Sequence, residues 1–178
     1  MAGAFPEYAC YSPIISRRET LVQIASQKES NVTVAFSEDG RVVGLAVLDF
    51  PAAGERWLRV GEKVMMEVAA VEVSRAYRSL GISTCLLNRI VDHPFREQRI
   101  FFMVGYSWTW DLDGTGLDPM AYRSMMVRLF AKEGFQTLQT NEPNVMMRPE
   151  NLFMARIGSE VGDDRKLRFK RVRFNMDG

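Results

Sequence analysis

The residues best suited to chemistry lie in the segment 67–88, EVAAVEVSRAYRSLGISTCLLN. Its pattern predicts an apolar strand, a tight turn that carries Arg78 and Gly81, and a helix that begins at Ile82. The first backbone N–H groups of a helix have no partner inside it and lie at the positive end of the helix dipole, so they bind phosphate groups. Gly81 allows the backbone to approach such a ligand closely, and the guanidinium group of Arg78 suits phosphate oxygens. The turn therefore predicts a phosphate or pyrophosphate site.

The turn also has a purely structural explanation, because a tight turn needs glycine for its backbone and a nearby Arg is often only solvated. A resemblance favours the functional interpretation. The segment VEVSRAYRSLGISTCLL resembles the acyl-CoA-binding motif of the GNAT N-acetyltransferases, in which a strand leads through R/Q-x-x-G-x-G/A into a leucine-rich helix. Ser83 stands where Gly or Ala is usual, and it is small enough for the same close approach. The resemblance implies that acetyl-CoA is bound by Val71, Val73, Arg78, Ser79, Leu80, Gly81, Ile82, Ser83 and Thr84.

Three further segments, SWTWDLDGTGL, AYRSMM and ENLFMARIG, resemble the acetoin-utilisation acetyltransferases, the AcuA family. With the loop, they extend the resemblance from about Arg56 to Phe174. It implies an enzyme that acetylates a lysine side chain of an acyl-CoA synthetase and thereby lowers the activity of that synthetase. Two alternatives keep the same cofactor: a small-molecule amine N-acetyltransferase, and a non-catalytic acyl-CoA-binding regulator.

Acetyl transfer to lysine requires a neutral amine, whereas the pKa of free lysine is about 10.4. A buried carboxylate is the usual base, acting directly or through a water. The predicted strand offers Glu72 and Glu67, which are five residues apart and are therefore expected on opposite faces. Glu72 is the preferred base because it precedes Val73, whose backbone N–H should polarise the thioester carbonyl according to the family resemblance. Glu67 is the second candidate.

The residue that protonates the departing thiolate is less obvious. The segment LFAKEGF resembles the family's L-Y-x-x-x-G-F, with Phe130 in place of the tyrosine that often acts as general acid. The proton donor is then Tyr106, Tyr122 or a water, or the thiolate leaves unassisted.

The segment WTWDLDGTG is expected to receive the acceptor lysine. Asp111 and Asp113 would attract its ammonium group, and Trp108 and Trp110 would supply apolar contact area. A structural interpretation carries equal weight, because aspartates and glycines form turns and tryptophans are often core residues.

The elements that must position these residues are predicted in the order helix, hairpin, strand, helix, strand, helix, strand, strand. Asp118 and Pro119 are typical of a helix N-cap and first turn. The order matches a mixed α/β sheet of the GNAT type, with central strands that splay apart, in a single domain over residues 1–178. The predicted helices begin near Ser16, Ile82 and Ala121, and the predicted strands are 31–37, 41–50, 67–73, 99–106, 135–140 and 152–158.

Composition limits the remaining possibilities. The 178 residues are 47% hydrophobic with a net charge of +1, so nucleic acid is not an expected partner. No apolar run approaches the roughly 20 residues of a membrane span, and no signal peptide is evident, so we expect a cytoplasmic protein without membrane contact. Cys10 and Cys85 are too few and too distant for a zinc site or a disulfide framework, and no metal is expected.

Four isolated features complete the set. Cys85 is interpreted as a small core residue, and Gly158 as the site of a close backbone approach. His93, the only histidine, is not expected to be catalytic. The basic tail DRKLRFKRVRF is interpreted as a solvated face, or as a contact for CoA phosphates or a partner.

Overall fold

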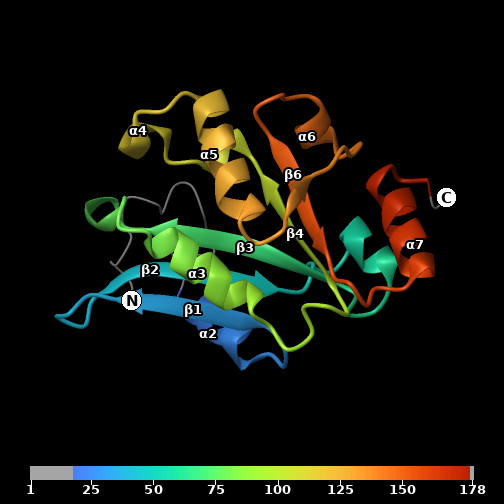
Figure 1. Ribbon diagram of the computed structural model, residues 1–178, viewed down its shortest axis with the longest axis horizontal. Helices are drawn as coiled ribbons and strands as arrows, with labels where there is room; N and C mark the ends of the chain where they lie inside the picture. The colour runs from blue at the N-terminus through green and yellow to red at the C-terminus, as the bar shows by residue number, and fades with distance from the viewer. Residues whose placement is uncertain (1–17, 177–178) are drawn as a thin grey trace.

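The structure, a computed structural model, describes residues 18–176 (Figure 1). Six strands form a mixed sheet in the order β1-β2-β3-β4-β6-β5. Neighbouring strands are antiparallel except β3 and β4, which are parallel. The predicted α/β class is therefore confirmed. The strands are β1 (Asn31–Phe36), β2 (Val42–Asp49), β3 (Met65–Val73), β4 (Ile100–Gly105), β5 (Gln136–Thr137) and β6 (Leu152–Ile157). Cys10 lies outside the described residues.

The helices begin close to their predicted positions. The side chain of Asp118 accepts a hydrogen bond from the backbone N–H of Ala121 at 2.9 Å, so the predicted N-cap is confirmed. The helices are α2 (Arg18–Ser26), α3 (Ile82–Val91), α4 (Leu112–Thr115), α5 (Pro119–Ala131), α6 (Pro143–Met146) and α7 (Asp163–Arg173). Short 3-10 turns are η2 (Arg56–Val60), η3 (Arg75–Tyr77) and η4 (Ser107–Thr109). None of the helices in the described range is long and apolar enough to cross a membrane.

Helices cover both faces of the sheet (Figure 1). On the first face, α3 and α5 bury Leu87, Ile90 and Phe130 against the sheet. The second face carries two smaller clusters, one beneath α2 and one between the sheet, η2 and α7. The second of these packs Trp57 against Phe153, with ring centroids 4.7 Å apart. Strand β4 lies between β3 and β6 and is almost wholly buried, as its apolar sequence predicts.

The two parallel strands separate after a short paired stretch. Their register runs from Met65 opposite Ile100 to Glu67 opposite Phe102, and the pairing found within residues 18–176 ends there. The rest of β3, through Val73, continues without β4 as a partner. The expected splay of the central strands is confirmed. We call the point at Glu67 and Phe102, where the strands part, the fork.

A β-bulge in β3 changes the directions of its side chains. Val47 of β2 lies opposite Ala70, and the next residue, Leu48, lies opposite Val68, so Ala69 is the extra residue of the bulge. Ala69 and Ala70 consequently pack toward the same cluster, beneath α2. In a regular strand, two residues five positions apart point to opposite faces, but the extra residue of the bulge brings them back to the same face. Glu67 and Glu72 therefore lie on the same face, and the expectation of opposite faces is wrong.

The C-terminal part of the chain holds the other differences. The basic tail forms α7, which its sequence did not predict because only Phe169 and Val172 anchor it in the core. The predicted strand 135–140 is reduced to two residues of β5. The side chain of Cys85 is exposed, so its assignment to the core is wrong. Although its helix is apolar overall, Cys85 faces away from the side that carries Leu86, Leu87 and Ile90.

Candidate active site

The loop between β3 and α3 has the backbone geometry of an anion site. Ser79 and Gly81 both have positive φ angles, 64° and 78°, and Gly81 is the N-cap of α3. The first helical bond from the helix body joins the Cys85 N–H to the Gly81 carbonyl at 3.1 Å. The backbone N–H groups of Ile82, Ser83 and Thr84 have no acceptor among the residues that the structure describes. A Cβ on Gly81 would meet no atom within 4 Å, so glycine is required by the φ angle and the space beside it is open.

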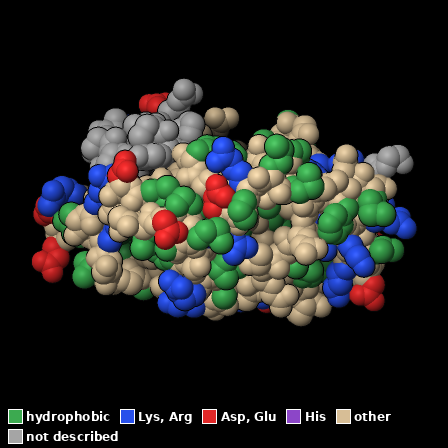
Figure 2. All heavy atoms as spheres, turned by 90° about the horizontal axis from the view of Figure 1, so that it is seen from above, with side chains coloured by type: hydrophobic (Ala, Val, Ile, Leu, Met, Phe, Trp, Pro, Cys, Tyr) green, Lys and Arg blue, Asp and Glu red, His purple; other side chains and the backbone are tan. Residues whose placement is uncertain are grey.

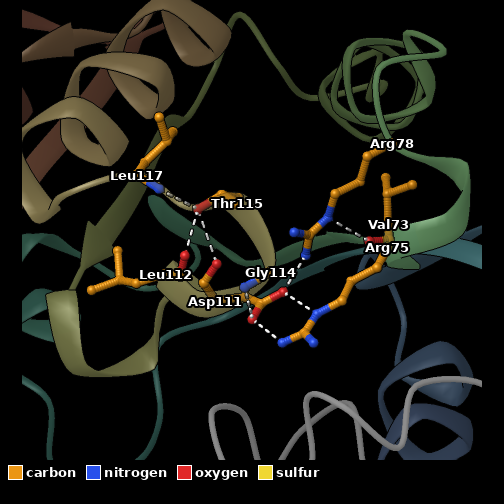
Figure 3. A network of polar contacts seen from close by, with 8 residues as sticks. All are labelled: Val73, Arg75, Arg78, Asp111, Leu112, Gly114, Thr115 and Leu117. Atoms are coloured by element: carbon orange, nitrogen blue, oxygen red, sulfur yellow. Dashed lines mark hydrogen bonds and ion pairs between the residues drawn. The ribbon is translucent and has the colours of Figure 1, made fainter.

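Asp111 connects this loop to the segment after β4 (Figure 3). Its carboxylate is 2% exposed and accepts hydrogen bonds from Arg75 Nε at 2.9 Å and Arg78 Nη2 at 2.7 Å. Arg75 donates a further hydrogen bond to this carboxylate from Nη2, and the backbone N–H of Gly114 donates another at 3.1 Å. The hydrogen bond from Arg75 is the main reason that the pKa of Asp111 is lowered to about 2, although burial opposes the shift. We call Arg75, Arg78, Asp111 and Gly114 the Asp111 clamp.

Gly114 makes the Asp111 clamp sterically possible. A Cβ at this position would lie 2.1 Å from Oδ2 of Asp111 and 2.3 Å from Nε of Arg75. Both atoms belong to the ion pair itself, so any larger residue would have to break it. This contact explains the glycine in the segment DLDGTG.

The two strand glutamates are partly buried and have strongly altered acidity. Burial is the main reason that the pKa of Glu67 is raised to about 7, and the neighbouring carboxylates of Glu55 and Asp49 contribute to the same shift. Burial also raises the pKa of Glu72 to about 7, against the opposing effect of the Arg78 guanidinium. A carboxyl group that titrates near neutral pH is suited to general base catalysis.

Tyr106 and Tyr122 occupy different environments. Tyr106 follows β4, and its pKa is raised to about 12 by burial and by the carboxylates of Glu142, Glu67 and Glu55, so its phenol stays protonated. Tyr122 is 9% exposed and stacks on Trp110 in the first core cluster, with ring centroids 4.9 Å apart. Phe130 is buried against Phe135.

The four residues predicted to bind the acceptor divide into two pairs. Trp110 is 6% exposed and lies in the core with Tyr122, and Asp111 is enclosed by its arginines. Asp113 and Trp108 are exposed, and Trp108 stacks on Tyr106 with ring centroids 4.8 Å apart. The surroundings of the first pair favour the structural interpretation, and only the second pair is accessible to an acceptor.

The surroundings of Gly158 and His93 indicate structural roles for both residues. A Cβ on Gly158 would lie 2.3 Å from the carbonyl oxygen of Glu97, so the predicted close backbone approach is confirmed. His93 lies beyond the end of α3 that is remote from the loop. Its Nδ1 accepts from the Phe95 N–H at 3.2 Å, so its Nε2 donates to the Glu29 carbonyl at 3.0 Å. Burial lowers the pKa of His93, which therefore stays neutral near pH 7.

Three residues that position the loop were not predicted from the sequence: Arg75, Gly114 and Gly44. The spacing of Asp111 and Gly114, an Asp followed three residues later by Gly, is a turn signal that could have identified Gly114. No local pattern identifies Gly44 of β2, because the residues that require a glycine there belong to α3, about forty residues later in the sequence. A Cβ there would lie 2.9 Å from Leu86 Cδ1 and 3.2 Å from Ile82 Cγ2, so its absence allows the first turns of α3 to pack on the sheet.

Comparisons with known proteins give the same fold. A family model described as the acetyltransferase (GNAT) family matches residues 5–107. Acetoin utilization protein AcuA of Bacillus licheniformis is 32% identical over 169 residues, covering 95% of this chain and 80% of the relative. The crystal structure of an acetoin utilization protein from Exiguobacterium sibiricum has a TM-score of 0.81 at 29% identity, covering 88% of this chain and 74% of that one. A phosphinothricin acetyltransferase from Sinorhizobium meliloti, solved in complex with AcCoA, shares the fold with a TM-score of 0.56 at 16% identity, covering 89% and 85%.

Proposed function

Because the chain belongs to the acetyltransferase (GNAT) family, we propose that it transfers the acetyl group of acetyl-CoA to a lysine side chain of an acyl-CoA synthetase and thereby lowers the activity of that synthetase. The similarity to AcuA, which extends over most of the chain, supports an acetyltransferase with a role connected to acetoin utilisation. The identity of the acceptor rests on the family resemblance.

One observation carries the acyl-CoA part of the proposal. Beyond the fork, β3 pairs with β2 but not with β4, and it leads to a loop whose N–H groups at Ile82, Ser83 and Thr84 have no acceptor within the described part of the chain. These groups would bind the pyrophosphate of acetyl-CoA, and the edge of β3 that β4 leaves beyond the fork, near Val71, would bind its pantetheine arm. Arg78 is held beside the loop by Asp111. That a protein of this fold is solved with AcCoA supports the assignment.

The pantetheine arm separates the thioester from the pyrophosphate, so the reactive group lies away from the loop. The distance of the thioester from the loop favours Glu67, at the fork, as the base. Glu72 lies next to the loop, where the charge of Arg78 opposes the rise in its pKa. Glu67 would take the proton from the acceptor ammonium, directly or through a water, and the neutral amine would then attack the thioester carbonyl. The C–N bond forms as the C–S bond breaks, and Tyr106, which stays protonated beside Glu67, would protonate the thiolate. The nitrogen loses its second proton as the amide forms, and this proton would restore the phenol of Tyr106.

The acceptor would approach from the side of the exposed residues Trp108 and Asp113. The carboxylates around the fork, Asp49, Glu55 and Glu142, would attract its ammonium group. Such surroundings also suit a polyamine, so the acceptor screen must include one.

The test is to incubate the protein with labelled acetyl-CoA and either an acetyl-CoA synthetase or spermidine, and to map the labelled atom. We expect label on one lysine of the synthetase and a fall in synthetase activity. Label on spermidine alone would replace the proposed acceptor with a small amine. Binding of acetyl-CoA without transfer, even in a single turnover, would identify a regulator instead of an enzyme.

A further inference from the structure

A second hollowed surface lies at the end of the sheet away from the β3–α3 loop, where α7 packs against η2 (Figure 1). Two adjoining hollows of about 450 and 410 Å³ follow this junction and share Asp164 and Arg168. The first is lined also by Arg59, Leu167 and Arg171, and the second by residues 60–64 and Arg165. We call the two hollows together the α7 groove.

The side chains that line the α7 groove are net positive, with Arg59, Lys63, Arg165, Arg168 and Arg171 against Glu62 and Asp164. Helix α7 contains six Lys or Arg residues and two Asp residues, a net charge of +4, whereas the complete chain has +1. Arg165, Arg168, Lys170 and Arg171 have no acidic partner among residues 18–176. Figure 2 shows basic side chains gathered at this end of the molecule, among hydrophobic ones. Unpaired cations that line a groove provide charge complementarity to an acidic partner.

Apolar side chains are exposed beside these cations. Leu167, which lines the α7 groove, is 52% exposed, and Leu58 of η2 is 43% exposed. On the opposite side of the helix, Phe169 and Val172 are buried against the cluster that contains Trp57. The buried pair fixes the orientation of α7, so the basic and apolar side chains are presented on a rigid support. The surface therefore suits a ligand that carries both carboxylates and apolar groups.

We propose that the α7 groove docks an acidic segment of the acceptor protein, with its carboxylates on Arg168 and Arg171 and an apolar side chain against Leu167. The proposal rests on the proposed function only for the identity of that protein. A nucleic acid fits less well, because the rest of the chain carries a net charge of −3 and the groove presents the exposed apolar side chain of Leu167, for which a phosphate backbone has no matching group.

The α7 groove is separated from the proposed transfer site. Turn η2 precedes the first residue of β3, whereas the loop follows its last, and a strand of nine residues spans about 26 Å. A segment held in the groove would therefore anchor the acceptor without contacting the acetyl-CoA loop. Such anchoring gives specificity for a whole protein over a free amine.

Binding is tested on the complete protein by fluorescence anisotropy, with a labelled short peptide in which Glu and Leu alternate. We expect the R168E/R171E variant to bind this peptide roughly tenfold more weakly than the wild type, and added salt to weaken wild-type binding. The control K28E/R89E makes the same charge change on exposed residues elsewhere, and Arg89, like Arg171, lies in the last turn of its helix. It should bind normally. Equal binding by R168E/R171E, no binding by the wild type, or tighter arginine-dependent binding of duplex DNA or phosphatidylglycerol vesicles would overturn the proposal.

A kinetic measurement separates this inference from the proposed function. With the synthetase as acceptor, R168E/R171E should raise KM roughly tenfold and leave kcat unchanged, whereas a short lysine peptide should be acetylated at the wild-type rate. Calorimetry with coenzyme A is the independent reference. If the chain does not bind coenzyme A but binds the acidic peptide through Arg168 and Arg171, the proposed function is wrong and the docking surface is supported. Normal coenzyme A binding with an unchanged KM for the synthetase would do the reverse.

Discussion

Asp111 and Glu67 carry the same functional group, and their surroundings give it opposite properties. Guanidinium groups on either side hold the pKa of Asp111 at about 2, so it stays ionised and fixes two arginines. Burial near other carboxylates brings the pKa of Glu67 to about 7, where it can both accept and release a proton. We therefore propose that the strand glutamates carry the chemistry and that Asp111 positions the loop.

The first prediction concerns the base. Glu67→Gln should lower kcat roughly 100-fold without changing the affinity for acetyl-CoA, because the amide cannot take a proton. Wild-type turnover should rise as the pH increases through about 7, the pKa of Glu67, and this rise should be absent in the variant. Steady-state kinetics over that pH range, with calorimetry for acetyl-CoA, provide the measurement. Glu72→Gln is the matched comparison, and if it alone abolishes turnover, the base is Glu72.

The second prediction concerns the Asp111 clamp. Asp111→Asn should destabilise the protein by about 3 kcal/mol, because it removes one partner of a buried ion pair. Gly114→Ala should act in the same way, since its Cβ would overlap the ion pair. Both variants should bind acetyl-CoA more weakly because Arg78 loses its anchor. Thermal unfolding and calorimetry test these effects, with Glu38→Gln, on the exposed turn between β1 and β2, as control. Tighter binding of acetyl-CoA by Asp111→Asn would show that Asp111 competes with the phosphates for Arg78.

At the scale of elements, most of the architecture and the position of the β3–α3 loop could be predicted from the sequence. The alternating hairpin, the apolar β4 and the Asp118 N-cap were each recognisable locally. The bulge at Ala69 was not, because it depends on the register between β2 and β3, and it reverses the relation between Glu67 and Glu72. Helix α7 was missed for a related reason, since the apolar contact that holds it comes from Trp57, more than a hundred residues earlier.

The third prediction tests how α3 is positioned. Gly44→Val should displace the first turn of α3, because a Cβ at this position already lies 2.9 Å from Leu86 Cδ1 and 3.1 Å from the Glu72 carbonyl oxygen. We expect the affinity for acetyl-CoA to fall roughly tenfold, with a loss of about 1–3 kcal/mol in stability. Gly44→Ala should have a smaller effect, and adding Leu86→Ala to it should restore part of the affinity by removing the nearest contact. Normal affinity in Gly44→Val would mean that the loop is placed independently of β2.

At the scale of the whole molecule, three kinds of group link folding to pH. Glu67 and Glu72 have folded-state pKa values raised from 4.5 to about 7, so the folded chain retains protons that the unfolded chain has lost, and stability falls as pH rises through this window. Asp111 and Glu97, whose pKa values are lowered to about 2, stabilise the fold above about pH 4, and this contribution is lost in acid. His93, with a lowered pKa, acts against the two glutamates because the unfolded chain binds its proton more readily below about pH 6.5.

These groups together predict a stability maximum near about pH 5. Above this pH, Glu67 and Glu72 lower the stability by more than His93 raises it, and below this pH the protonation of Asp111 and Glu97 lowers the stability. Raising one carboxyl pKa from 4.5 to about 7 corresponds to about 3 kcal/mol, so the free energy of unfolding should fall by several kcal/mol between about pH 5 and pH 8. Urea unfolding across this range measures the fall, and the double variant Glu67→Gln with Glu72→Gln should remove most of it. An equal fall in the double variant would mean that other groups carry the pH dependence, and that the two strand carboxyls are not raised together in the folded protein.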